Sequence, residues 1–139
     1  MKKIAKSKRP EAERAAEHVA VEVFGCVATR RALRTKFAKV DFFGCDVIGL
    51  ARRGVKFWLQ VTAGQMGAVQ TRRKRLLQYE WGDDDYVMVM QLVERAKVDN
   101  PREKEWFFRV WELHRKGVWD EISPIPIKRE WFKARRDDA

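Results

Sequence analysis

The stretch VDFFGCDVIGLARRGVKFWLQVTAG, residues 40–64, decides the fold of this chain. It holds two runs rich in β-branched and aromatic residues, separated by an Arg-Arg-Gly connection at 52–54. A three-residue connection that ends in glycine suits a β-hairpin with a bulge. With that loop, the register places Asp46 directly opposite Gln60, with both side chains on one face of the sheet. Thr62 lies two residues beyond Gln60 and points to the same side.

The residues before this hairpin predict a helix, a short strand and a basic loop. Apolar residues recur at three- and four-residue spacing from Glu11 to Val23, which is typical of a helix with one buried face. The run CVATRR at 26–31 then predicts a short strand. The segment Arg30–Lys39 holds five Lys or Arg residues and no acid, so we expect it to be the loop that meets nucleic acid.

The residues after the hairpin predict a second helix and further strands. The segment 68–79 has amphipathic spacing and a basic face, and Gly-Asp-Asp-Asp at 82–85 has the composition of a turn. Three further segments read as strands or extended chain: YVMVMQLV at 86–93, WFFRVWEL at 106–113 and ISPIPI at 122–127. The fold class is therefore α/β, a mixed central sheet of four or five strands flanked by helices. A basic arm, 1–9, precedes a single domain, 10–139.

Charge and composition narrow the classes of partner. The net charge is +10, and such a positive potential concentrates polyanions, so we expect DNA or RNA as the partner. Basic residues are not gathered on one face of an amphipathic helix, which disfavours a membrane surface. No apolar run of about 18 residues occurs, and the basic N-terminal residues lead into no apolar segment, so we expect a cytoplasmic protein. Cys26 and Cys45 lack the spacing of a zinc site, and two buried thiols are favoured over a disulfide bond.

Acidic residues on rigid elements suggest phosphodiester chemistry. Metal-dependent cleavage needs oxygen ligands that hold a cation beside the phosphate. Asp46 lies within an apolar strand, where an uncompensated carboxylate is costly and a metal partner is favoured over a role in a turn. By the predicted register, Gln60 can share that metal.

Three short motifs now resemble the core of the PD-(D/E)XK nucleases, and most of all the archaeal Holliday junction resolvases. AER at 12–14 is similar to the family's helical Glu motif, and DVI at 46–48 to the Asp that opens its second strand. QVT at 60–62 stands where the family has Glu-x-Lys on the third strand, and departs from it at both functional positions. The resemblance implies a restriction-endonuclease-like core with metal ligands at Glu13, Asp46 and Gln60.

The resemblance also implies an activity and its partners. We expect a metal-dependent endonuclease, a Holliday junction resolvase that uses Mg²⁺ or Mn²⁺ and no small-molecule cofactor. Its substrate is a four-way DNA junction, and it acts as a homodimer because symmetric cutting needs two sites. It works in the cytoplasm, or in the host cytoplasm if a phage encodes it.

The missing motif lysine needs a replacement. Thr62 stands in its place, and Lys74 on the second predicted helix is preferred to Lys56 as the residue that orients water and neutralises charge. Glu17, one turn after Glu13, is the reserve for the helical ligand. The predicted catalytic residues are Glu13, Asp46, Gln60, Thr62 and Lys74. The predicted nucleic-acid-binding residues are Lys8, Arg9, Arg30, Arg31, Arg34, Lys36, Lys39, Arg72 and Arg73.

Two rival functions stay open at this point. One is a binding module on the same fold that has lost catalysis, which the substitutions at 60 and 62 favour. The other is a different nuclease of the superfamily, restriction-like or end-processing. The remaining polar residues have plainer interpretations: the aspartates at 83–85 as a solvated turn, and His18 and His114 as surface or packing residues.

Overall fold

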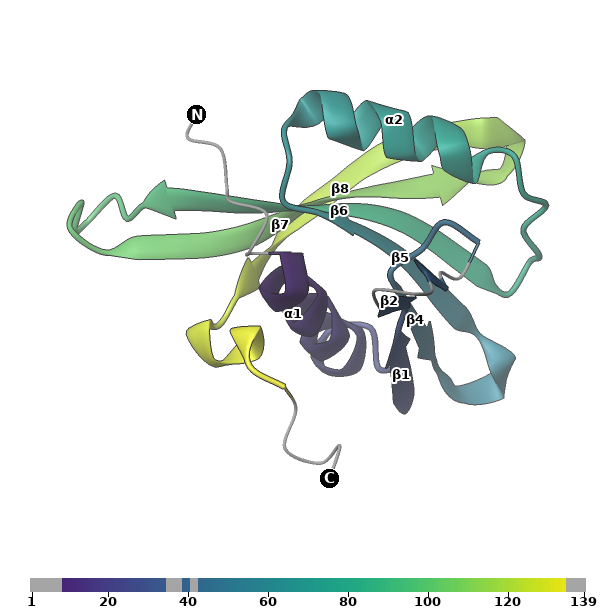
Figure 1. Cartoon of the computed structure of the whole chain (residues 1–139), viewed down its shortest axis with the longest axis horizontal. Helices are drawn as coiled ribbons and strands as arrows, with labels where there is room; N and C mark the ends of the chain where they lie inside the picture. The colour runs from purple at the N-terminus through teal and green to yellow at the C-terminus, as the bar shows by residue number, and fades with distance from the viewer. Residues whose placement is uncertain (1–8, 35–38, 41–42, 135–139) are drawn as a thin grey trace.

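A six-stranded mixed sheet with a helix on each face forms the body of the protein (Figure 1). The computed structural model describes residues 9–34, 39–40 and 43–134. The helices are α1 (Arg9–Glu22) and α2 (Met66–Leu76). In sheet order, the strands are β1 (Ala28–Arg31), β4 (Val47–Leu50), β5 (Lys56–Thr62), β6 (Asp85–Ala96), β7 (Lys104–His114) and β8 (Val118–Ile127). The pair β2 (Leu33–Arg34) and β3 (Lys39–Val40) forms a separate two-stranded sheet, and short 3-10 turns lie at Arg52–Gly54, Arg115–Gly117 and Arg129–Phe132.

The sheet has one parallel pair. The pairs β1–β4 and β4–β5 are antiparallel, the pair β5–β6 is parallel, and the pairs β6–β7 and β7–β8 are again antiparallel. The parallel step requires a crossover, which α2 provides between β5 and β6. The α/β class is confirmed. The predicted number of strands was too small, because ISPIPI belongs to the ten-residue edge strand β8.

The predicted hairpin is present with the predicted register. Val47 pairs with Leu59, and the loop is closed by a 2.8 Å hydrogen bond from the Ala51 N–H to the Val55 carbonyl. Gly54 has a φ of 76°, a conformation that glycine adopts without steric cost. The regular ladder ends at the pair Val47–Leu59: Asp46 lies in a bend, and its N–H donates to the Leu59 carbonyl at 2.9 Å, so the predicted pairing of Asp46 with Gln60 is not part of the ladder.

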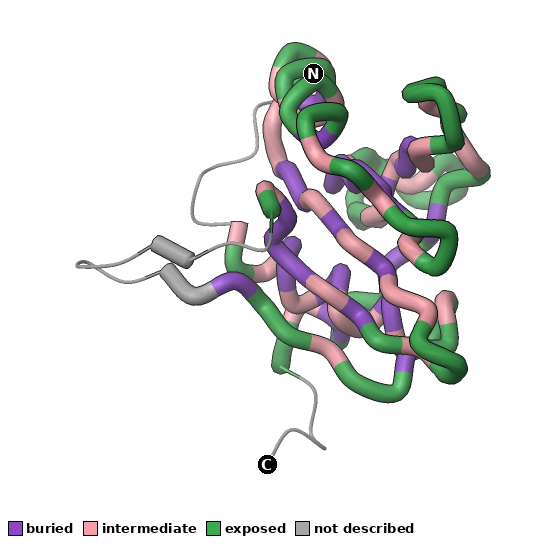
Figure 2. The backbone as a smooth tube through the Cα atoms, turned by 90° about the vertical axis from the view of Figure 1, so that its right-hand side faces the viewer, coloured by how far each residue is buried: buried purple, intermediate pink, exposed green. Residues whose placement is uncertain are grey.

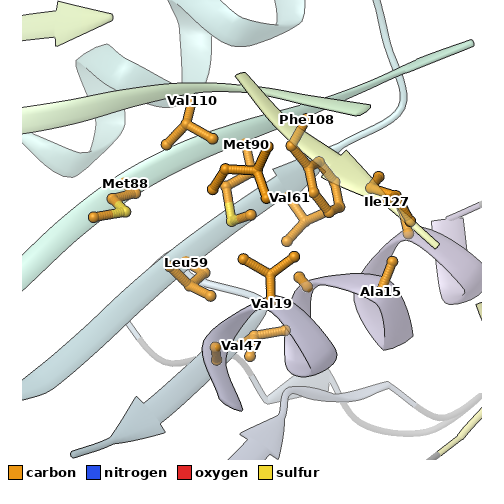
Figure 3. Packing of buried hydrophobic residues seen from close by; sticks show 14 of the residues in the cluster. Ala15, Val19, Val47, Leu59, Val61, Met88, Met90, Phe108, Val110 and Ile127 are labelled. Carbon is orange, nitrogen blue, oxygen red and sulfur yellow. The ribbon is translucent and has the colours of Figure 1, made fainter. Parts of the chain in front are cut away.

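The two faces of the sheet carry different cores. Leu59 and Val61 point to the α1 face, where Val19 of α1 meets residues of the strands (Figure 3). On the alternate face, Trp58 packs near Val69 of α2. Because side chains alternate along a strand, Gln60 belongs to the α2 face. Buried residues occupy the middle of the strands, and the turns at the rim are exposed (Figure 2).

Helix α1 approaches β4 closely at Gly49. A Cβ placed on Gly49 would lie 2.6 Å from the Cys26 sulfur and 3.3 Å from the Ala20 Cβ. The absence of a side chain at Gly49 therefore sets the distance between helix and sheet. Cys26 and Cys45 are both free and buried, as predicted, and burial raises the pKa of the Cys26 thiol.

Several boundaries differ from the prediction. Arg9 belongs to α1 and not to the basic arm, whose other residues lie outside the described chain. The segment 30–39 is not one loop, because it contains the end of β1 and the strands β2 and β3. Within the described ranges, no helix is long and apolar enough to cross a membrane.

Candidate nuclease-like site

Asp46 lies in a bend just before β4 and is almost completely buried, with 1% of its surface exposed. Its Oδ2 accepts a 2.8 Å hydrogen bond from the backbone N–H of Val61, and its own N–H donates to the Leu59 carbonyl at 2.9 Å. Strand β5 therefore fixes both the backbone and the carboxylate of Asp46. A buried carboxylate held in this way is oriented as a metal ligand must be.

Glu13 reaches the same region from α1. It is 5% exposed, on the helix face that also buries Ala12 and Ala16. Arg9, one turn earlier, links it to Asp46: the Arg9 Nε lies 3.6 Å from Glu13 Oε2, and the Arg9 Nη2 lies 3.5 Å from Asp46 Oδ1. One guanidinium thus contacts both carboxylates, which places them within reach of a single cation.

Gln60 supplies an amide whose orientation is fixed. Its Nε2 donates a hydrogen bond to the carbonyl of Gly44. The Gln60 Oε1 is buried and has no hydrogen-bond partner among the residues that the structure describes. A buried acceptor without a donor is costly, and a hard cation that prefers oxygen ligands would satisfy it.

The donor set fits magnesium or manganese by its chemistry. Two carboxylates and an amide carbonyl are the oxygen ligands that hard divalent cations prefer. Over the described ranges, no three His, Cys, Asp or Glu residues gather into a metal-binding group. Glu13 and Asp46 form a pair of carboxylates bridged by Arg9, whereas Gln60 lies on the α2 face of β5.

Thr62 holds the connection to α2. It is 4% exposed, and its hydroxyl accepts a 2.9 Å hydrogen bond from the N–H of Gly64. Thr62 pairs with Gln91 on the neighbouring strand β6. The Gln91 Nε2 donates a 3.0 Å hydrogen bond to the Gly64 carbonyl, and its Oε1 is buried with no hydrogen-bond partner among the described residues. The sequence analysis missed Gln91, although a single amide within the apolar run VMVMQLV could have marked it.

The structure does not bring the two candidate lysines to Asp46. Lys74 is exposed on α2. At 100° per residue it lies about 140° around the helix axis from Val69, which is buried against the sheet. Lys56 lies at the hairpin end of β5, where its Nζ contacts the Gly54 carbonyl at 3.4 Å. Four residues along a strand span about 13 Å, so Lys56 is distant from Gln60. Among the described ion pairs, Asp46 is contacted by Arg9, which the sequence predicts as a DNA-binding residue.

The reserve ligand Glu17 has a different role. Its carboxylate forms a 2.9 Å ion pair with Arg31 and accepts a 2.7 Å hydrogen bond from the Thr29 hydroxyl. Glu17 therefore connects α1 to β1. The predicted DNA-binding residue Arg31 is therefore engaged within the protein, while Arg30 is exposed.

The other predicted DNA-binding residues are distributed over several elements. Arg34 and Lys39 lie on β2 and β3, and Lys8 and Lys36 fall outside the described residues. Arg72 and Arg73 are half-buried on α2, where the Arg73 guanidinium lies 5.8 Å from the centre of the Trp119 ring.

The remaining polar candidates have structural partners. Asp85 accepts hydrogen bonds from the Trp58 indole at 2.9 Å and from the Gly82 N–H at 2.7 Å. The His18 Nε2 lies 2.8 Å from the Lys133 carbonyl, and its ring stacks on Trp131. His114 lies 3.0 Å from Asp120. The packing and surface interpretations of His18 and His114 agree with these contacts, and Asp83 and Asp84 lie in an exposed turn, whereas Asp85 is the partly buried first residue of β6.

Comparison with protein-family models, with curated proteins and with solved structures finds no match for this chain.

Proposed function

We propose that this protein is a metal-dependent nuclease of the PD-(D/E)XK kind that acts on branched DNA. The observation that carries the proposal is a pair of buried carboxylates from two elements that one guanidinium bridges. Glu13 of α1 and the bend residue Asp46 share the Arg9 guanidinium, and Gln60 of β5 has a buried oxygen with no hydrogen-bond partner among the described residues. Aspartate and glutamate side chains are rarely buried this deeply, and two buried carboxylates held side by side favour a functional site.

The order of elements supports the same proposal. Counted along the chain within the main sheet, β4 is the second strand and β5 the third. The PD-(D/E)XK resemblance requires an Asp where the second strand opens and an ExK-like motif on the third. Asp46 and Gln60 occupy these places, and Glu13 lies on the helix before them.

The chain's own groups have separable roles in cleavage. A bound Mg²⁺ or Mn²⁺ would lower the pKa of a coordinated water and neutralise charge that develops on the phosphate. Val61 orients Asp46, and Gly44 orients Gln60, so these ligands need little rearrangement. The Arg9 side chain is 40% exposed, so it can turn from the two carboxylates towards the phosphate and supply the positive charge that Thr62 lacks.

A binding module without catalysis is the second candidate. It is favoured by one observation: Arg9 already neutralises Glu13 and Asp46, while Thr62 uses its hydroxyl to hold Gly64. In this case the three ligands would be structural, and DNA binding would persist without cutting. Metal dependence separates the two functions.

Junction specificity and dimerisation are parts of the same proposal. The test compares a labelled four-way junction with a linear duplex of matched sequence, each with magnesium, manganese or chelator, and reads binding and cleavage together. Paired, metal-dependent cuts restricted to the junction support a dimeric resolvase. Cutting of the linear duplex as well would point to another nuclease of the superfamily, and binding without cuts to the inactive module.

A further inference from the structure

An aromatic cluster lies on the α2 face of the sheet, the face that carries Gln60. Phe43 is 58% exposed, and its ring meets Trp58 and Tyr79 edge-on, each at a centroid distance of 5.6 Å. Trp81 completes the cluster, at 5.3 Å from Trp58 and 5.7 Å from Tyr79. We call Phe43, Trp58, Tyr79 and Trp81 the aromatic cluster. The Phe43 ring is exposed, whereas the rings of Trp58, Tyr79 and Trp81 are partly buried, so Phe43 is the member of the cluster that can meet a partner.

Two connections tie the aromatic cluster to the site. Trp58 precedes Gln60 by two residues on β5, so both side chains lie on the α2 face, about 7 Å apart along the strand. Phe43 precedes Gly44, whose carbonyl holds the Gln60 amide. The same segment therefore presents the exposed ring and fixes the candidate ligand.

The last turn of α2 adds positive charge at this place. It carries Arg73, Lys74 and Arg75, and the buried Leu76 that follows lies 3.7 Å from the position that a Cβ on Gly44 would take. The basic end of α2 thus adjoins the segment that bears Phe43. Exposed aromatic rings beside basic side chains are the combination that binds single-stranded nucleic acid, because rings stack on bases and cations attract phosphates.

We propose that the aromatic cluster stacks on an unpaired base of DNA, next to the phosphate held at the candidate site. The proposal rests on the proposed function and deepens it, because it names the substrate feature that the protein selects: a nucleotide that is unpaired or easily unstacked, as at a branch point. Phe43 provides the exposed face. Fully paired duplex offers no free base to this ring.

The test measures binding in the presence of chelator, so that it does not depend on cleavage. Fluorescence anisotropy gives the affinity for a short labelled oligothymidylate and for a blunt duplex of similar charge. Phe43→Ala should weaken oligothymidylate binding by about fivefold or more and leave duplex binding within about twofold. Phe43→Leu, which keeps an apolar contact with Trp58 and Tyr79 but has no aromatic face, should lose as much, and Phe43→Tyr should lose little.

Tyr86 provides a matched control. It is also an exposed aromatic residue, at 42%, but its ring stacks on Phe57, which belongs to the core on the α1 face. Tyr86→Ala should leave both affinities unchanged. Circular dichroism and the melting temperature confirm that each variant is folded.

The outcomes separate the stacking proposal from the nuclease proposal. Equal binding of oligothymidylate by wild type, Phe43→Ala and Phe43→Leu overturns stacking, as does failure of the wild type to bind oligothymidylate. A Phe43 variant that changes only the oligomeric state in sedimentation assigns the aromatic cluster to a subunit interface, and also overturns stacking. Absence of metal-dependent cleavage in the same wild-type preparation removes the nuclease function and leaves the stacking result intact.

Discussion

Asp46 and Val61 are joined across the hairpin by a 2.8 Å hydrogen bond from the Val61 N–H to the carboxylate. Asn at position 46 retains an oxygen that can accept this bond but loses the charge that a divalent cation requires. Asp46→Asn should therefore fold like the wild type, bind DNA at least as tightly, and lose cleavage by about 100-fold or more. Single-turnover cleavage and anisotropy binding measure the two effects. Cleavage at the wild-type rate would remove Asp46 from the site, whereas parallel loss of binding and structure would assign it a purely structural role.

Arg9 neutralises Glu13 and Asp46 when no metal is bound, so its removal should make stability depend on metal. Arg9→Ala should lower the free energy of unfolding by about 1 kcal/mol in chelator, because two buried carboxylates lose a shared cation. Magnesium or manganese should restore this loss by binding the folded state. Chemical denaturation with and without metal gives both values.

Arg31→Ala is the matched control, since Arg31 also pairs with a glutamate of α1, at 2.9 Å from Glu17, and its side chain is 38% exposed against 40% for Arg9. Its stability should respond to metal as the wild type's does. A similar metal response from both variants would argue against a cation site between Glu13 and Asp46.

Gln60 is held by a contact that a carboxylate cannot make. In Gln60→Glu, an oxygen would face the Gly44 carbonyl that now accepts the Nε2 hydrogen bond. Without metal, this variant should be destabilised by about 1–3 kcal/mol, the cost of an unsatisfied buried group, although it restores the acid of the resembled motif. Thermal unfolding in chelator measures this loss. Gln60→Met removes the ligand oxygen without adding charge, so only Gln60→Glu should regain stability when manganese is added.

Gly49 sets the approach of α1 to the sheet. Gly49→Ala should cost about 1–3 kcal/mol of stability, because its Cβ would lie 2.6 Å from the Cys26 sulfur and 3.3 Å from the Ala20 Cβ, so the Cys26 side chain and α1 must both shift. Gly67→Ala is the opposite case: no atom lies within 4 Å of its added Cβ, and Gly67 belongs to α2, so helix propensity should stabilise the protein by about 1 kcal/mol. Urea denaturation of both variants measures the two changes in the free energy of unfolding. If Gly49→Ala is as stable as the wild type, close packing does not explain the glycine at position 49.

The hairpin could be predicted from the sequence because its information is local. A glycine-ended connection and alternating apolar residues fix both the loop and the register, from the pair Leu50–Lys56 to the pair Val47–Leu59. Helix α1 could also be predicted from the sequence, since the spacing of Ala12, Ala16 and Val19 selects one buried face.

The contacts that define the site depend on tertiary structure. Arg9 looked like part of a basic arm because local composition does not reveal that a helix begins there and meets a bend 37 residues later. Lys74 looked suitable because sequence shows a basic helix but not which residues of that helix face the sheet. The full length of β8 was missed for a similar reason: prolines discourage a central strand but are tolerated in an edge strand.

The most direct test of the central claim is cleavage of a labelled four-way junction by the wild type and by Asp46→Asn, with manganese and with chelator. The account predicts cuts by the wild type in manganese alone, and tight binding without cuts by Asp46→Asn. Junction binding by the wild type with no cleavage under any metal condition, or equal cleavage by Asp46→Asn, would contradict it.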